Sequence, residues 1–161
     1  MTIRIFSWIL AIAAECIAQS TPVQPLPFSH KTHSAEAKLA CLECHANPQK
    51  FGAEMGFPPV SKCMACHVLV ARDKPAIRRL AEMAQSKEPV EWKRVYRLAQ
   101  FAFFDHRYHL MKGAKCEDCH GAIAEQDVTV DRLHSTGMSF CQGCHTRSRA
   151  PNGCGVCHDP R

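Results

Sequence analysis

The pattern of apolar and polar positions begins with a short apolar run near the N-terminus. Arg4 precedes ten apolar or small residues from Ile5 to Ala14, and the small residue Ala18 follows them closely. This order is typical of a cleavable export signal, and ten residues are too few to cross a membrane core, which needs about 20. We therefore predict a signal peptide, or a short anchor, over residues 1–18 and a periplasmic or other extracytoplasmic location. Lipidation of Cys16 is the weaker alternative, because the charged Glu15 precedes it.

Further along, only one segment has clear helical periodicity. Pro75 suits the first position of a helix, and the predicted helix ends at Ser86. Its apolar face consists of Ile77, Leu80, Ala81 and Ala84. The following stretch, 90–104, is rich in aromatic residues and is predicted to be extended or to form a short β-hairpin, with Trp92 and Tyr96 on one side.

Apolar side chains are too few for an ordinary core. Without residues 1–18 the chain has 161 − 18 = 143 residues, and 26 of these, or 18%, are Leu, Ile, Val or Phe. This share is below the roughly 20% at which chains fail to build a core from side chains alone. The length excludes a large multidomain enzyme. Something other than side chains must fill the interior.

The cysteines indicate what fills it. Apart from Cys16, every cysteine belongs to a Cys-x-x-Cys-His motif. The cysteine pairs are Cys41 and Cys44, Cys63 and Cys66, Cys116 and Cys119, Cys141 and Cys144, and Cys154 and Cys157, followed by His45, His67, His120, His145 and His158. Two thiols at this spacing form thioethers with the vinyl groups of one haem, and the next histidine ligates its iron. Zinc sites or disulfides would leave the five histidines unexplained. We predict five covalently bound haem c groups and no catalytic residue.

The remaining histidines are candidates for the opposite face of each iron. There are five of them, equal in number to the motifs: His30, His33, His106, His109 and His134. This equality indicates that every iron has two imidazole ligands. Methionine is the alternative ligand, and Met55, Met64, Met83, Met111 and Met138 also number five. Their contexts favour packing, since Met64 lies inside a motif and Met83 on the predicted helix.

An internal repeat divides the chain. The segment 28–45 aligns with 104–120, and each begins with Phe-x-His-x-x-His and ends with a haem motif. This predicts a dihaem module over 19–72, a helix and linker over 73–98, and a trihaem module over 99–161.

The order of histidines and motifs in 106–158 resembles a trihaem class III cytochrome c, a small family with closely packed, bis-histidine haems. The resemblance implies a mainly helical and irregular fold with a haem-packed core, here as two class III-like modules. It also implies specific ligand pairs. These are His106 with His120, His109 with His145, His134 with His158, His30 with His45, and His33 with His67. The shorter module departs from the family, because it lacks a third haem and a third spare histidine.

The whole chain also resembles pentahaem cytochromes that include the pentahaem subunit of alternative complex III. The matching residues are Phe28 to His33, Gly56 to Pro59 with Ser61 to His67, Trp92 to Leu98, and Phe103 to His106. A membrane-anchored subunit of that kind would be expected to have a longer apolar N-terminal segment.

These expectations favour an exported electron carrier that acts between other redox proteins. The alternatives are a haem subunit of a membrane-bound quinol-oxidising complex, associated with the membrane through a partner or an uncleaved N-terminus, and a reductase with an open iron site. The net charge of +5 does not define the partner. Lys93, Arg94 and Arg97 form a basic group without a nucleic-acid-binding motif, so we expect no nucleic-acid partner and assign them to a solvated or docking face.

Overall fold

The structure is a computed structural model that describes residues 22–46, 54–129, 132–133 and 135–158. Its regular elements are helices joined by irregular segments, and these residues contain no β-strand. The predicted small, mainly helical and irregular fold is therefore confirmed. The predicted signal peptide, residues 1–18, lies outside the described residues.

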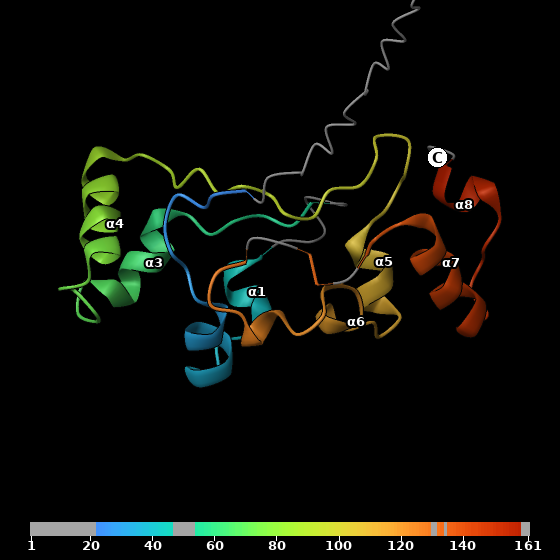
Figure 1. Cartoon of the computed structure of the whole chain (residues 1–161), viewed down its shortest axis with the longest axis horizontal. Helices are drawn as coiled ribbons and strands as arrows, with labels where there is room; N and C mark the ends of the chain where they lie inside the picture. The colour runs from blue at the N-terminus through green and yellow to red at the C-terminus, as the bar shows by residue number, and fades with distance from the viewer. Residues whose placement is uncertain (1–21, 47–53, 130–131, 134, 159–161) are drawn as a thin grey trace, which may run out of the picture.

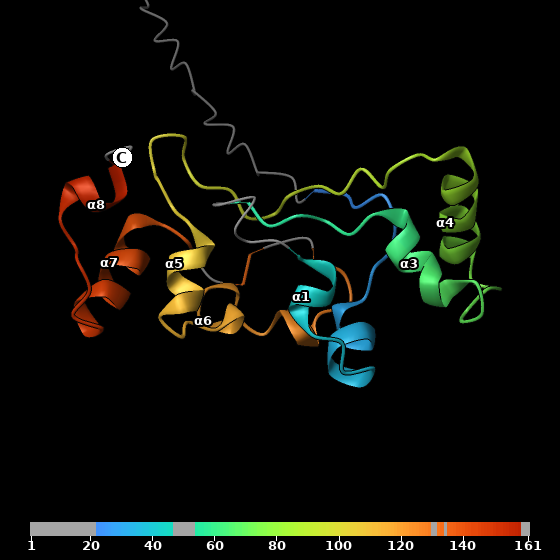
Figure 2. The same cartoon turned by 180° about the vertical axis from the view of Figure 1, so that it is seen from behind.

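Most helices are only one or two turns long, and the haem motifs account for many of them. In chain order the elements are η1 (a π-helix, Lys31–Glu36), α1 (Cys41–Cys44), α3 (Val60–His67), α4 (Pro75–Ser86), α5 (His106–Met111), α6 (Cys116–His120), η2 (a 3-10 helix, Ile123–Glu125), α7 (Met138–Arg147) and α8 (Cys154–His158). The five motifs fall on α1, α3, α6, α7 and α8. Figures 1 and 2 show these helices spread along the long axis of the molecule.

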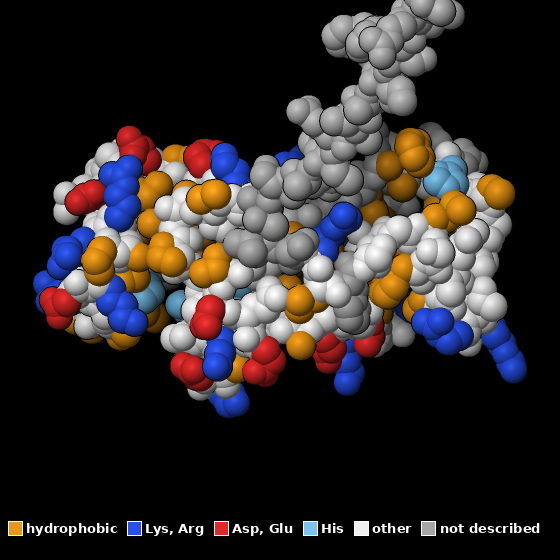
Figure 3. All heavy atoms as spheres, in the orientation of Figure 1, with side chains coloured by type: hydrophobic (Ala, Val, Ile, Leu, Met, Phe, Trp, Pro, Cys, Tyr) orange, Lys and Arg blue, Asp and Glu red, His pale blue; other side chains and the backbone are white. Residues whose placement is uncertain are grey.

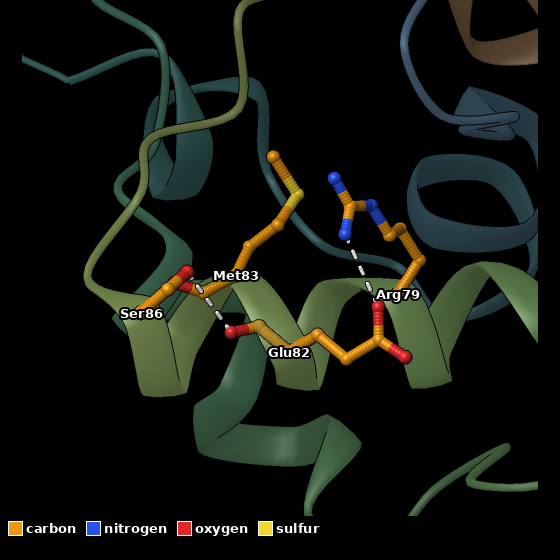
Figure 4. A network of polar contacts seen from close by, with 4 residues as sticks. All are labelled: Arg79, Glu82, Met83 and Ser86. Atoms are coloured by element: carbon orange, nitrogen blue, oxygen red, sulfur yellow. Dashed lines mark hydrogen bonds and ion pairs between the residues drawn. The ribbon is translucent and has the colours of Figure 1, made fainter.

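Helix α4 has the bounds that its periodicity predicts. Pro75 is its first residue, and Lys87 ends it in a left-handed conformation with its N–H donating to the carbonyl of Met83. The Ser86 hydroxyl also donates to backbone carbonyls of the last turn, and Arg79 forms an exposed ion pair with Glu82 at 3.2 Å (Figure 4). The contacts of Lys87 and Ser86 satisfy carbonyls that a helix end leaves unpaired.

The apolar face of α4 packs against α3 and forms a small cluster. Leu26, Leu80 and Met83 are the buried apolar side chains of the described residues, with Trp92 partly buried against them. Other partly buried members are Val60, Cys63, Met64, Ile77 and Val90. The cluster is far too small to hold the whole chain together.

The stretch after α4 is irregular and extended, so the β-hairpin alternative is not observed there. It nevertheless joins distant segments. The Phe103 N–H donates to the carbonyl of Cys157 at 2.7 Å, which fixes α8 beside this stretch. Arg94 is three-quarters buried, pairs with Glu54 at 3.3 Å, and lies over the ring of Phe57 at 4.8 Å. Arg94 is therefore an internal contact and not part of a solvated basic face.

Many large apolar side chains lie on the surface. Leu69 is 81% exposed and Phe101 69%. Figure 3 shows apolar side chains interspersed with charged ones along the visible face. The described residues include no helix that combines the length and the apolar character needed to span a membrane.

Candidate haem-binding sites

Four of the five implied histidine pairs are brought together. The ring centres of His30 and His45 are 6.3 Å apart, and those of His106 and His120 are also 6.3 Å apart. The remaining two pairs, His33 with His67 and His109 with His145, are each at 6.0 Å. In all four pairs, a histidine of a Cys-x-x-Cys-His motif faces a histidine of a Phe-x-His-x-x-His segment.

This spacing fits two imidazoles on opposite sides of one metal ion. An imidazole nitrogen lies about 2 Å from a bound first-row metal and about 1 Å from its own ring centre, so two such rings have centres about 6 Å apart. Rings in direct stacking contact would be closer, and two unrelated rings would have no reason to repeat one distance. The four pairs therefore fit bis-histidine haem iron.

The two copies of the Phe-x-His-x-x-His segment have the same local geometry. Phe28 is edge-on to His30 and stacked on His33, with centres 5.0 and 4.4 Å away. Phe104 has the same relation to His106 and His109, at 4.8 and 4.5 Å. The phenylalanine thus fills the space between two histidines that serve different sites, which explains its place in the repeated pattern.

Ring orientation differs between the first and second pair of each copy. The rings of His30 and His45 are 13° from parallel, and those of His106 and His120 are 8° from parallel. The second pairs are rotated, by 65° for His33 with His67 and 49° for His109 with His145. The four sites therefore fall into two geometric kinds.

Backbone carbonyls hold most of these rings by their Nδ1 atoms. The accepting carbonyls are Ser29 for His33, Gly56 for His45, Val70 for His67, Asp105 for His109, Pro151 for His145 and Phe101 for His158, at 2.6–3.0 Å. A carbonyl oxygen has no proton to donate, so Nδ1 must carry the hydrogen in each ring. The Nε2 lone pair is then free to ligate a metal, and the carbonyl contact raises its basicity.

Burial keeps the deepest imidazoles in the form that binds metal. Burial, with smaller contributions from the nearby His45 and His33, lowers the pKa of His30 to about 4. Burial also lowers the pKa of His120, with His106 and His45 adding to the effect. Neutral imidazole is the ligating form, so these rings are competent ligands at neutral pH.

The fifth site is described only on one side. His158 lies at the end of α8, with its Nδ1 on the Phe101 carbonyl and its ring 5.8 Å from the Phe101 ring. Its implied partner, His134, lies outside the described residues. The pairing of His134 with His158 therefore stays a prediction.

The ten motif cysteines are unpaired, and no disulfide forms between them in the described structure. Burial raises the pKa of the thiols of Cys44, Cys63, Cys116, Cys119 and Cys141. Within the described residues, no group of three or more His, Cys, Asp or Glu side chains forms an ordinary metal site.

Electrostatic effects between cysteines of different motifs indicate which motifs are neighbours in space. Burial is the main cause of the raised pKa of Cys63 and of Cys116, and a cysteine of the first motif adds to each, Cys44 to that of Cys63 in the second motif and Cys41 to that of Cys116 in the third. Beyond the third motif, Cys144 raises the pKa of Cys119, and Cys157 raises that of Cys141. The order in space is thus second, first, third, fourth and fifth, which agrees with α3, α1, α6, α7 and α8 along the long axis in Figure 1.

Four of the five candidate methionines lie in the apolar cluster or at the surface. Met83 is buried in the apolar cluster of α3 and α4, and Met64 packs against that cluster. Met111 and Met138 are 76% and 64% exposed. The observed imidazole pairs favour histidine over methionine as the second ligand at the four described sites.

Two similarities to known proteins accompany this geometry. Residues 102–160 match the family described as cytochrome c7 and related cytochrome c. The chain is also 28% identical to the menaquinone reductase multihaem cytochrome c subunit of Nitratidesulfovibrio vulgaris strain Hildenborough, over 84% of this chain and 76% of the relative. Haem c in such proteins is covalently bound, as the cysteine motifs require. The resemblance of this chain to multihaem electron-transport cytochromes c is thereby confirmed.

Proposed function

We propose that this chain is an exported pentahaem cytochrome c that transfers electrons within, or to, a quinone-converting respiratory complex. The observation that carries the proposal is the set of four imidazole pairs at 6.0–6.3 Å, each built on a haem-attachment motif. Together with the fifth motif on α8, they support five haem sites in one row.

The residues that would hold the haems follow from the motifs. The ten motif cysteines would form thioethers, and the histidine that ends each motif would ligate iron from one side. His30, His33, His106, His109 and His134 would ligate from the other side. When bound, haem c supplies a one-electron Fe(III)/Fe(II) couple whose potential the axial ligands and their surroundings tune.

The protein's own contribution is orientation and insulation. Carbonyls on Nδ1 fix the rings of the ligating histidines, and Phe28 and Phe104 hold two rings each at set angles. The exposed apolar side chains, such as Leu69 and Phe101, supply surface that flat porphyrins can cover. With two imidazoles at each iron, no position is left for a substrate, so we infer electron transfer without substrate chemistry.

The relative's name supports membership of a complex over free diffusion. That protein is a subunit of menaquinone reductase, and the aligned region covers three-quarters of it. We infer that this chain occupies a comparable place, receiving electrons from or passing them to a partner that handles quinone. An exported location follows if residues 1–18 direct secretion.

Purification of the protein from its own host tests the proposal. We expect an intact mass equal to the signal-free polypeptide plus five haems, and a quinone-reactive partner that remains bound through size-exclusion chromatography. A holoprotein that purifies alone under mild conditions would favour the free carrier. Four or fewer haems in fully matured protein would contradict the pentahaem assignment.

The reductase alternative has a separate test. An open iron site would give a high-spin ferric signal in electron paramagnetic resonance and would bind carbon monoxide rapidly once reduced. We expect low-spin signals only and slow carbon monoxide binding at neutral pH, because imidazoles occupy both axial positions.

A further inference from the structure

His30 differs from six other described histidines in the kind of group that lies at its Nδ1. Six rings donate to backbone carbonyls, which no substitution can remove. The Nδ1 of His30 instead lies 3.1 Å from the side-chain hydroxyl of Thr129, 99 residues further along the chain. Both residues are half-buried. This contact depends on the identity of one side chain.

Thr129 is held in place by the segment that precedes it. The Lys31 N–H donates to the carbonyl of Gln126 at 2.9 Å, and the Ser29 hydroxyl donates to Asp127 at 3.0 Å. The residues on either side of His30 therefore both bind the 126–129 segment. Three neighbouring contacts align residues 29–31 with residues 126–129. This alignment places the hydroxyl of Thr129 beside His30.

Gln24 fastens the same segment from its other side. Its side-chain amide donates to the Thr129 carbonyl at 3.2 Å and to the Lys93 carbonyl at 3.0 Å, and its oxygen accepts from the Lys93 N–H at 3.1 Å. One side chain thus ties the N-terminal segment, the linker and the 126–129 segment together. Thr129 is restrained at its backbone as well as at its hydroxyl.

We propose that Thr129 is the positioning residue for His30, setting the orientation and basicity of this ligand from the predicted trihaem module. The inference rests on the proposed function, in which His30 ligates the haem of the first motif. With Nε2 on the iron, Nδ1 carries the hydrogen and donates it to the Thr129 hydroxyl, which strengthens the donation from Nε2. It also holds the ring near parallel to that of His45, at 13°. The potential of the first site thereby depends on docking of residues from the second module.

The test compares substitutions of Thr129 in the holoprotein. Thr129→Val removes the hydroxyl at constant shape and Thr129→Ser retains it. Thr32→Val is the matched control, because Thr32 is an exposed threonine two residues from His30. His30→Met first identifies which low-spin signal belongs to this site, since only that signal should change strongly. Midpoint potentials are then read by titration followed with electron paramagnetic resonance.

We expect Thr129→Val to keep five haems and to shift the midpoint potential of the His30 site upward, because weaker donation disfavours ferric iron. Thr129→Ser and Thr32→Val should leave that midpoint at the value of the unmodified protein. Thr129→Val could instead lose the first haem. In that case the positioning role is supported if Thr129→Ala also loses this haem and Thr129→Ser keeps it. Loss in Thr129→Ser would overturn it.

Failure of this inference and failure of the proposed function give different results. If His30→Met changes no low-spin signal, His30 is not a ligand and the proposed function fails at this site. A different outcome is that His30→Met removes one signal whose midpoint potential and line shape are the same in all Thr129 variants. His30 is then a ligand that does not depend on Thr129, and the positioning role fails. Equal shifts in Thr129→Val and Thr32→Val would also overturn the positioning role.

Discussion

Cys41 lies close enough to Cys116 to add to the rise that burial causes in the pKa of its thiol, although the two cysteines belong to different predicted modules. Cys41 opens the first haem motif and Cys116 opens the third. The second motif, on α3, lies on the other side of the first, as the influence of Cys44 on Cys63 indicates. The first and third sites are therefore direct neighbours, and the junction between modules falls between them.

This adjacency predicts an electrostatic effect across the junction. His106→Met should raise the potential of the third site, so that it takes up its electron first. The added negative charge should then lower the midpoint of the His30–His45 site more than that of the His33–His67 site, because Coulomb interactions weaken with distance. Potentiometric titration of each signal measures this. A larger effect on the His33–His67 site would contradict the spatial order.

Removal of the last haem-attachment site should remove one haem and leave the other four in place. Cys154→Ser combined with Cys157→Ser removes both thioethers of α8, which lies at one end of the row (Figure 1). We expect an intact mass lower by one haem, with the four other low-spin signals retained. The control is the same double substitution at Cys116 and Cys119 on α6, in the middle of the row, which should perturb neighbouring signals.

The two kinds of ring orientation should be visible spectroscopically. Near-parallel imidazoles at the His30–His45 and His106–His120 sites split the iron d orbitals strongly, whereas the rotated rings at the other two described sites split them weakly. We expect two classes of low-spin ferric signal, with the more anisotropic class from the rotated pairs. His33→Met should remove a signal of the anisotropic class only. One uniform class would contradict the orientations.

The small apolar cluster should contribute local stability only. Leu80 is one of the three buried residues of the cluster and is 5% exposed. Leu80→Ala should lower the free energy of unfolding of the α3–α4 region by about 2–3 kcal/mol. Arg79→Ala, next to it but exposed, should cost no more than about 0.5 kcal/mol. Hydrogen exchange of α4 amides distinguishes the two. Equal effects would show that the cluster is not a core.

The haem-free chain should not fold. Only three apolar side chains of the described residues are buried, which cannot offset the conformational entropy of ordering more than a hundred residues. Expression without haem attachment should give a chain whose circular dichroism shows little helix and no cooperative melt. A native-like cooperative transition in this material would mean that the side chains alone suffice.

Much of this arrangement could be predicted from the sequence because its signals are local. The helix from Pro75 to Ser86 follows from periodicity and a proline at its start, and the ring pairs follow from motif order in a known family. The repeat of Phe28 to His33 in Phe104 to His109 predicted equivalent roles, and the two copies have matching ring geometry.

The other features of the fold and of the candidate sites depend on contacts that cannot be predicted from residue type. Carbonyls such as that of Pro151 hold the histidines, and any residue supplies a carbonyl. Along the long axis of the molecule the second motif, on α3, precedes the first, on α1 (Figure 1). The spacing of the motifs along the chain does not predict this order. Thr129 resembles any surface threonine until the fold brings it to His30. The extended path of residues 90–104 was one of two alternatives, and the sequence did not decide between them.

The distance along the chain between His30 and Thr129 has a consequence for biogenesis. An exported chain is synthesised and translocated from its N-terminus, and each described imidazole pair joins residues of one module, so a pair can close soon after its segment has been exported. The contact at 99 residues of separation closes a long loop and must form late. Maturation should therefore pass through a species in which the first haems are attached while His30, the proposed ligand, still lacks its hydroxyl partner. Chains truncated before residue 129 would stop at that stage.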